Sequence, residues 1–529
     1  MGPPINPLEV GQMRRASISV WAAAVALTVA GSVAVAVAVA AGRPGHAVTS
    51  PRLPGIPHGA RSGGAIRSPI THVVEIMLEN HTFDDLFGSL PGADGIPAGT
   101  TLPNPNESYD SAAPVAPIVA GPNQGSVGPT LNNGRRVEYM AMDRQPNGRF
   151  AMDDYTEIPA DGLASITTFP PSEDPNLQFL ATHYALAQHN FQPEVAPTQP
   201  NVTSALAGDS DGWYFNNQAP AGDTYHTIFD ELQAAGRSWK IFYGVPPSLL
   251  AGSIWDQYQP AGATDGLVGT DQFIADAAAG ALPNFSFVRP GFGYSQESPE
   301  DLSQGDAWLG QLVHAVMSGP DWSSTAIFLT YDEGGGFWDH VSPPQPDSAG
   351  YGTRTPLVVV SPYVRQGLIS QTTTNLSVLS FTQRLFGLPT LDRANALAPS
   401  LLADFDFDRP APAPQLPPVS PPDTLRMSEG SGYSLTYTAR PGSTITVNLL
   451  ANDAGLDQDS SLDEPVSLTA TGPPNAAAAT VPGSVQVSGG AASFKARFPT
   501  AGYWRIKATG PDGSLGWVTF AVGTNAETP

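Results

Sequence analysis

Short apolar runs alternate with helical patterns through the middle of the chain. Residues 72–78, 325–330 and 356–360 are mostly apolar, as expected for strands that are buried on both faces of a sheet. Residues 227–235 and 308–317 have apolar positions at helical spacing. This repeated order of strand and helix predicts a doubly wound α/β sheet.

Beyond about residue 425 the pattern changes to alternation with a period of two. The alternating segments are 434–438, 444–448, 493–498, 503–507 and 517–522. Short strands of this kind, separated by Gly, Pro and Asp turns, predict a β-sandwich of about a hundred residues. A proline-dense run precedes it and is typical of a stiff spacer. Aromatic residues of this module are candidates for contact with lipid or cell-wall polymer, and packing in its own core is the alternative.

Residues 1–42 are predicted to be a signal peptide or a membrane anchor. Arg14 and Arg15 precede an Ala/Val-rich stretch over 16–41, and small residues near its end favour signal cleavage. The paired arginines partly match a twin-arginine export signal, but the stretch is also long enough to span a bilayer. Both interpretations place the rest of the chain outside the cytoplasm, either secreted or anchored. Residues 43–67 are rich in Gly, Pro, Ser and Arg, which indicates a flexible spacer.

Length, charge and cysteine content exclude several classes of function. The chain has 529 residues, which suggests more than one folded unit. Its formal net charge is −24, and the sequence offers no basic patch, which argues against a nucleic-acid partner and against attraction to an anionic membrane. A zwitterionic or small phosphate ester is therefore favoured over a polyanion. Because the chain has no cysteine, disulfides, thiolate metal sites and cysteine nucleophiles are excluded.

Polar side chains follow the ends of the predicted strands and precede one predicted helix. Asp332 and Glu333 come just after one apolar run, and Glu79 and Asn80 follow another. Open α/β sheets bind ligands at this edge, and hard oxygen ligands are those that divalent cations prefer. Thr198 stands just before a helix of small residues, where free backbone N–H groups can bind an anion. Together these residues predict a metal-assisted phosphoryl-transfer site, although Asp332 and Glu333, which precede three glycines, could also form a solvated turn.

Four blocks of sequence resemble the bacterial phosphoesterase family of secreted phospholipases C and acid phosphatases, which is related to the alkaline phosphatase superfamily. They read HVVEIMLENHTFDDLFG, HYALAQHNFQPEVAPTQPN, LPNFSFVRP, and PDWSSTAIFLTYDEGGGFWDHVSPP with GTRTPLVVVSPYVRQG. The blocks occur in the family's order and cover roughly residues 70–408. The resemblance implies a three-layer α/β/α sandwich of the alkaline phosphatase type. We expect this catalytic domain over 68–409, a linker over 410–424 and the β-sandwich domain over 425–525.

The resemblance also implies roles for individual residues. A divalent metal ion, of an identity that the sequence leaves open, would be held by Glu79, Asn80, Thr198, Asp332 and Glu333. Thr198 would attack phosphorus and form a phosphothreonine intermediate, because metal coordination makes its hydroxyl a usable nucleophile. Asn80 would also donate to a non-bridging oxygen. His340 would contact the phosphate or protonate the leaving oxygen.

Two positions depart from the family pattern. Related sequences often have Arg or His where this chain has Val202, and they often have a histidine in the loop that here runs from Ser295 to Pro299. Both changes remove groups that could touch phosphate, so a catalytically weak member is an alternative. Arg135 and Arg136 could reach a phosphate, with a surface salt bridge as the alternative for both.

The leading hypothesis is an exported, metal-dependent phosphoesterase that hydrolyses a phosphodiester in the manner of a phospholipase C. The expected partner is a phosphate ester or phospholipid, with contact to a membrane surface or cell wall. One alternative is an acid phosphatase-like phosphomonoesterase. Another is a surface binding protein in which the β-sandwich does the work. The sequence leaves the ester and the oligomeric state open.

Overall fold

The computed structural model describes most of the chain from residue 66 onward. The described ranges are 66–104, 113–120, 131–158, 161–210, 212–216, 225–244, 254–260, 263, 266–291, 294–298, 300, 302–345, 350–418, 424–427, 434–439, 441–442, 444–451, 465–473, 476–488, 491–510 and 515–522. No helix within these ranges is long and apolar enough to cross a membrane. The predicted signal peptide or anchor over 1–42 lies outside them.

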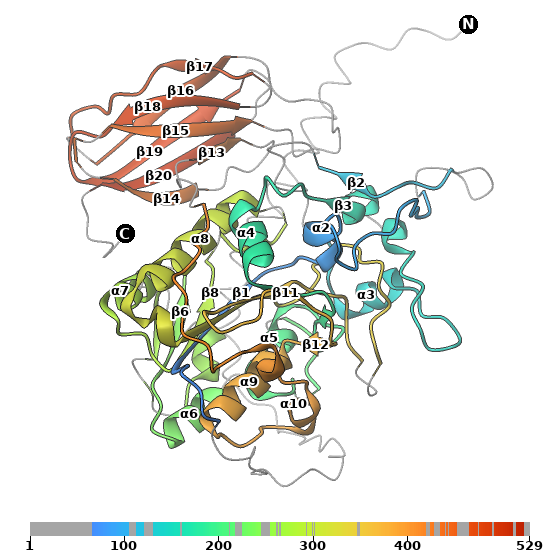
Figure 1. Ribbon diagram of the computed structural model, residues 1–529. Helices are drawn as coiled ribbons and strands as arrows, with labels where there is room; N and C mark the ends of the chain where they lie inside the picture. Colours follow the sequence, from blue (N-terminus) through green and yellow to red (C-terminus); the bar gives the residue numbers. More distant parts are fainter. Residues whose placement is uncertain are drawn as a thin grey trace, which may run out of the picture. The chain divides into compact units, whose positions relative to one another are not determined.

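An eight-stranded mixed sheet forms the centre of the larger part of the molecule (Figure 1). Its strands, in spatial order, are β11 (Gly367–Ile369), β4 (Ala185–Ala187), β10 (Leu357–Val360), β9 (Thr325–Tyr331), β1 (His72–Leu78), β8 (Phe285–Arg289), β6 (Trp239–Tyr243) and β7 (Leu267–Gly269). The five from β9 to β7 pair in parallel, whereas β10 is antiparallel to both of its neighbours. Every residue of β9 is buried, as the apolar run predicted.

Helices cover both faces of this sheet. One layer contains α4 (Pro175–His183), α7 (Thr270–Ala279) and α8 (Leu302–Ser318), and the other contains α5 (Thr198–Ala207), α6 (Ile228–Ala234), α9 (Leu376–Phe386) and α10 (Arg393–Leu397) (Figure 1). The predicted three-layer α/β/α architecture is confirmed. Helix α8 begins six residues before the predicted segment 308–317, because buried residues from Leu302 onward extend its apolar face.

Short elements lie around the carboxyl ends of the central strands and build the region of the predicted site. They are α2 (Phe83–Phe87), β2 (Ile118–Val119), α3 (Arg135–Ala141), η1 (Tyr155–Glu157), η2 (Gly162–Ile166), β3 (Thr167–Thr168), β5 (Asn190–Phe191) and β12 (Thr373–Thr374). The remaining short helices of this part are η4 (Ile254–Tyr258), η5 (Pro320–Ser324) and η6 (Leu401–Asp404).

The C-terminal part consists of two β-sheets that share one apolar core. One sheet has the order β13 (Thr424–Met427), β15 (Thr444–Ala451), β18 (Ala491–Arg497), and the other β14 (Ser434–Ala439), β20 (Leu515–Val522), β19 (Gly502–Thr509), β16 (Pro465–Thr471), β17 (Ser484–Gln486). Val447 and Phe494 from the first sheet are buried in the same cluster as Leu468 and Trp504 from the second. The β-sandwich is therefore present, and these two aromatic side chains pack in its core.

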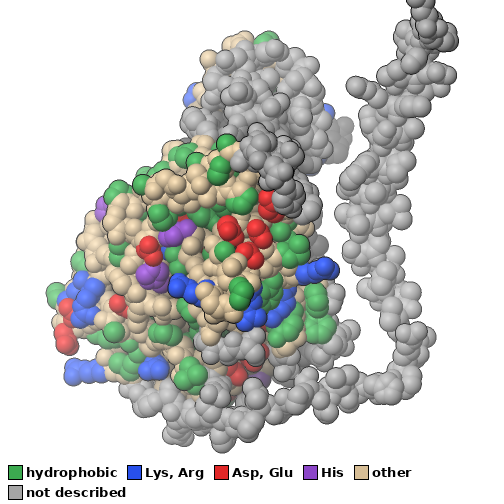
Figure 2. All heavy atoms as spheres, turned by 90° about the vertical axis from the view of Figure 1, so that its right-hand side faces the viewer, with side chains coloured by type: hydrophobic (Ala, Val, Ile, Leu, Met, Phe, Trp, Pro, Cys, Tyr) green, Lys and Arg blue, Asp and Glu red, His purple; other side chains and the backbone are tan. Residues whose placement is uncertain are grey.

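Charged side chains on the face shown in Figure 2 do not form a single basic area. Lys and Arg side chains stand there in separate groups, with acidic, polar and apolar side chains between them. This distribution agrees with the acidic composition of the whole chain.

A buried carboxyl group lies in the middle of the central strand. Glu75 on β1 is 1% exposed, and its Oε1 has no hydrogen-bond partner among the described residues. Its neighbours across the sheet are Phe287 and Phe328. Burial raises the pKa of Glu75 to about 8, and the positive charge of Arg289 opposes this only partly.

Replacing Glu75 by Gln should therefore increase stability at high pH more than at low pH. Between the usual pKa of 4.5 and about 8, the folded chain keeps a proton that the unfolded chain releases, so wild-type stability is lost as the pH rises through this range. The advantage of the Gln variant should grow by at most about 1.4 kcal/mol per pH unit. Urea unfolding at several pH values measures it, with the exposed Glu157→Gln as control. An advantage that does not change with pH would contradict this explanation.

Candidate active site

The two acidic pairs predicted from the sequence leave the same edge of the sheet side by side. Strands β1 and β9 are parallel neighbours, with Leu78 opposite Tyr331. The residues that follow therefore emerge together. The backbone N–H of Asn80 donates to Oδ1 of Asp332 at 3.4 Å, and the N–H of Asp332 donates to the carbonyl of Leu78 at 3.2 Å.

Thr198 lies between two of these carboxylates. It is the first residue of α5, and its Oγ1 is 3.2 Å from Oε1 of Glu333 and 3.3 Å from Oε2 of Glu79. A hydroxyl has one proton, so it can donate to only one of these oxygens at a time. The structure thus brings together all five residues predicted as metal ligands, although it does not test their roles.

Arg289, the last residue of β8, supplies the positive charge behind this group. Its guanidinium is fully buried and forms ion pairs with Glu79 and, at 3.2 Å, with Asp332. Its Nη1 also donates to the carbonyls of Met77 and Leu78. The guanidinium therefore binds both the side chains and the backbone at the end of β1.

The positive charge of Arg289 does not fully compensate the carboxyl groups of the site. Burial, and next the charge of Glu79, raise the pKa of Asp332 to about 7 in spite of Arg289. Burial and the charge of Asp332 raise the pKa of Glu333 well above its usual value. A fourth carboxyl belongs to Glu297, whose pKa is raised to about 8 by burial and then by the charges of Glu79 and Asp332. One arginine is thus too little positive charge for so many carboxylates.

The amide of Asn80 gives an independent test of whether a metal ion fits. Its Oδ1 is buried and accepts no hydrogen bond among the described residues. A buried oxygen without a partner lowers the stability of the fold unless a cation or a hydrogen-bond donor approaches it. The backbone of Asn80 has φ 64°, and a Cβ on Gly335 would lie 2.3 Å from the Asn80 Cβ. This close approach holds the amide at the site. Carboxylate, amide and hydroxyl oxygens are also the donors that a hard divalent cation prefers, so the residues present fit such an ion.

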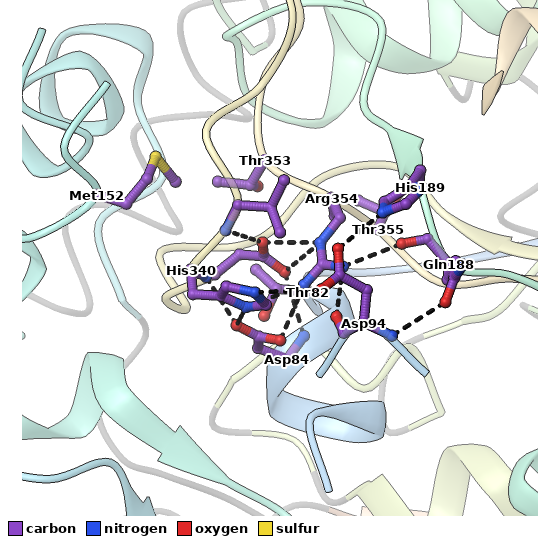
Figure 3. Close-up of polar contacts among 12 residues, drawn as sticks. Thr82, Asp84, Asp94, Met152, Gln188, His189, His340, Thr353, Arg354 and Thr355 are labelled. Atoms are coloured by element: carbon purple, nitrogen blue, oxygen red, sulfur yellow. Dashed lines mark hydrogen bonds and ion pairs between the residues drawn. The ribbon is translucent and has the colours of Figure 1, made fainter. Parts of the chain in front are cut away.

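His340 belongs to a different cluster, which Figure 3 shows. Its Nδ1 donates to Oδ2 of Asp84 at 2.7 Å, and Arg354 forms ion pairs with both Asp84 and Asp339. Burial acts to lower the pKa of His340, but the hydrogen bond to Asp84 and the charges of Asp84 and Asp339 outweigh it, so the pKa is raised. The described hydrogen bonds and ion pairs of His340 stay within this cluster and Asp94 and do not reach Thr198. Its predicted role in catalysis stays a prediction.

Among the described residues, two groups of acidic and histidine side chains have a spacing compatible with a metal ion, and Glu79, Asp332 and Glu333 do not form a third in this structure. Asp84, Asp339 and His340 form one, and Asp143, Asp153 and Asp154 form the other, each with ligand atoms within 4.8 Å of one another. In the first group the positive charge of the Arg354 guanidinium already pairs with both carboxylates, as a metal ion would. Acidic clusters such as the second are common on protein surfaces without an ion.

Sequence reasoning missed three residues that shape the site. Arg289 stood in a block quoted for its resemblance, but its partners depend on the order of strands in the sheet. Asn133 donates from Nδ2 to Oε1 of Glu333 at 3.0 Å. Gln192 accepts from the N–H of Gly334 at 3.0 Å through Oε1. Gln192 also stood in a quoted block, but its partner depends on the fold, and for Asn133 the sequence signal was a polar residue in a loop.

Comparisons with known proteins agree with this geometry. The sequence model of the Phosphoesterase family matches residues 70–389. Non-hemolytic phospholipase C of Burkholderia pseudomallei is 27% identical over 471 residues, which are 69% of this chain and 63% of that protein. Non-specific phospholipase C6 of Arabidopsis thaliana is 26% identical over 348 residues, 59% of this chain and 65% of that protein. The chain thus spans a little under two thirds of the length of these relatives.

Among solved structures, a Vibrio parahaemolyticus protein in the alkaline phosphatase superfamily matches with a TM-score of 0.35 and 11% identity. The match covers 67% of this chain and 76% of that one.

Replacing Arg289 by Met should destabilise the metal-free protein by about 3–5 kcal/mol, because it leaves buried carboxylates without their only guanidinium partner. A divalent cation should restore part of this loss. Urea unfolding with and without the cation tests both statements, and the exposed Arg149→Met serves as control. Equal stability of the Arg289 and Arg149 variants would show that Arg289 does not hold the carboxylates in place.

Proposed function

The chain belongs to the Phosphoesterase family, and we propose that it is a metal-dependent hydrolase of phosphodiesters that acts as a phospholipase C. The observation that carries the proposal is the position of Thr198, whose Oγ1 lies within 3.3 Å of two carboxylates at the start of a helix. The two carboxylates, the hydroxyl and the amide oxygen of Asn80, which has no hydrogen-bond partner among the described residues, can serve as ligands of a cation. The hydroxyl can also serve as the nucleophile.

In this proposal Oγ1 of Thr198 attacks phosphorus while the bond from phosphorus to the leaving alcohol oxygen breaks, and the proton of the Thr198 hydroxyl ends on the alcohol that departs. Water then hydrolyses the phosphothreonine, which releases the phosphorylated product and restores the hydroxyl of Thr198. Glu79, Asn80, Asp332 and Glu333 would hold the divalent cation together with Thr198. When bound, such a cation makes a hydroxyl a better nucleophile and offsets charge on the phosphoryl oxygens. The start of α5 offers an anion few N–H groups, because that of Gln199 already donates to Oδ1 of Asn216 and Pro197 and Pro200 have none.

The loop that presents Thr198 is held in place by buried polar contacts. Asn201 accepts from the N–H of Glu194 at 3.1 Å and donates to the carbonyl of Ala196. Glu194 in turn accepts from the hydroxyls of Ser204 and Ser210. A nucleophile held in this way loses little entropy when it reacts.

A phospholipid is the substrate class that we propose, for two reasons. The relatives reported above are named phospholipases C. In addition, Phe215 is 56% exposed next to Asn216, whose Oδ1 accepts from the N–H of Gln199 at 2.9 Å. An exposed aromatic side chain therefore lies near the first turn of α5, where an acyl chain or a membrane interface can cover it. Export of the protein, which this substrate would require, remains a prediction from residues 1–42.

One prediction of this proposal concerns the nucleophile. Thr198→Ala should lower turnover at least about 1,000-fold, since no other hydroxyl replaces it, while calorimetry still detects cation binding. Thr198→Ser keeps a hydroxyl and should retain part of the activity. Full activity of the Ala variant would remove Thr198 from its role.

Removing the cation with a chelator should abolish the same activity, and adding it back should restore it. Turnover of p-nitrophenylphosphorylcholine should exceed that of p-nitrophenyl phosphate. The reverse order would favour the phosphomonoesterase, and no turnover of either by the folded, metal-loaded protein would favour a binding protein.

A further prediction of this proposal concerns the lipid. Phe215→Ser should lower hydrolysis of phosphatidylcholine in vesicles by about 3- to 10-fold, the range expected for one lost aromatic contact. Hydrolysis of soluble p-nitrophenylphosphorylcholine should change little. Leu397→Ser is a matched control, because Leu397 is 71% exposed on α10, which adjoins the far end of α5 at Gly208. Equal losses on both substrates would exclude a lipid-specific role for Phe215.

A further inference from the structure

The proposed site lacks a positive charge that faces the substrate. Glu79, Asp332 and Glu333 bring three negative charges, which Arg289 and a divalent cation would just balance. Arg289 is fully buried, and its described contacts go to the two carboxylates and to two backbone carbonyls. A phosphodiester adds a further negative charge, so the site needs one more cation to bind it well.

Arg135 is the first residue of α3 and lies at the rim of this site. Two residues before it, Asn133 donates to Oε1 of Glu333, the same oxygen that lies 3.2 Å from the hydroxyl of Thr198. Arg135 itself donates from Nη1 to the carbonyl of Val195 at 2.8 Å, three residues before Thr198. Contacts on both sides of the site thus fix the position of this guanidinium.

Aromatic rings orient the guanidinium further. Its carbon Cζ lies 3.8 Å from the centre of the Tyr214 ring and 5.2 Å from that of Tyr139. Stacking uses the faces of the planar group. At its edge Nη1 donates to Val195 and Nη2 to the hydroxyl of Tyr139 at 3.5 Å, and the guanidinium has further N–H groups with which it can bind a phosphate. Tyr214 belongs to the loop whose Asn216 accepts from the N–H of Gln199. The hydrogen bond from Gln199 to Asn216 thus connects the loop that carries Tyr214 to the residue that follows Thr198.

Arg135 forms no ion pair within the described part of the chain, although its charge acts on the buried carboxyl of Glu138, three residues further along α3. Among the described residues none has a carboxylate oxygen within 4.0 Å of Arg135, although the chain as a whole carries a net charge of −24. The surface salt bridge considered in the sequence analysis is therefore absent for Arg135 within this part of the chain. Its charge remains available to an anion.

We propose that Arg135 binds the non-bridging oxygens of the substrate's phosphoryl group and supplies the positive charge that Val202 cannot. Val202, on α5, is apolar and 1% exposed. The inference rests on the proposed function, since it assigns the anion that the same site receives. Arg135 is then an anion-binding residue that contributes to both ground-state and transition-state binding.

Binding of inorganic phosphate to the metal-loaded full chain, measured by calorimetry, tests this inference without turnover. Arg135→Gln should weaken phosphate binding about 10- to 100-fold, as expected for the loss of charge-assisted hydrogen bonds. Arg135→Lys keeps the charge and should lie between Gln and wild type. Arg136→Gln, at the exposed neighbouring position, should change binding less than about twofold.

Three results would overturn the inference: no phosphate binding by the wild type, equal binding by the Arg135→Gln and Arg136→Gln variants, or equal losses for Arg135→Gln and Arg135→Lys with a lower melting temperature. The last would mean that Arg135 only supports the loop. Ester turnover separates this inference from the proposed function. If the wild type hydrolyses no ester but Arg135→Gln still weakens phosphate binding, only the proposed function fails.

Discussion

The ion pairs of Arg289 are the interaction on which the rest of the site depends. Asp332 and Glu333 are buried and Glu79 is partly buried at one edge of the sheet, and each buried carboxylate would cost several kcal/mol if it were isolated there. The guanidinium reduces this cost for Glu79 and Asp332 and binds the backbone of β1 at the same time. Its compensation is incomplete, because the pKa values of Asp332 and Glu333 stay raised. This incomplete compensation is consistent with the proposed cation, which would stabilise the site if it binds there.

The nucleophile loop and the acidic loop are joined by Gln192. Its Oε1 accepts from the N–H of Gly334, next to Glu333, and its Nε2 donates to the carbonyl of Glu194, at the base of the loop that carries Thr198. A shift of either loop would therefore break hydrogen bonds inside the protein, where they are not replaced by water. This connection explains how residues far apart in the sequence keep a distance of about 3 Å without any covalent link between them.

The positions of the acidic residues could be predicted from the ends of the strands, whereas the contacts of Arg289 could not. Apolar runs located β1 and β9, and the rule that parallel strands end at one edge of a sheet brought Glu79 and Asp332 together. The same rule says nothing about Arg289, because its contacts require β8 to be the other neighbour of β1. The resemblance gave His340 a role at the phosphate, and this role stays a prediction. Its hydrogen bond to Asp84 from α2 could not be predicted, because the two residues are far apart in the sequence.

The two buried arginine clusters differ in how completely their polar groups are hydrogen-bonded within the described part of the chain. In the cluster of Arg354, every carboxylate oxygen of Asp84 and Asp339 accepts a hydrogen bond from the guanidinium, His340 or the backbone. Its charges and hydrogen bonds are satisfied, so a metal ion would have to displace Arg354. In the cluster of Arg289, one hydroxyl proton is shared between two carboxylates, and the amide oxygen of Asn80 has no described donor. The first arrangement fixes the loops around α2, whereas the second leaves polar atoms without a described partner, and this difference supports the proposal of a cation site at the edge of β1 and β9.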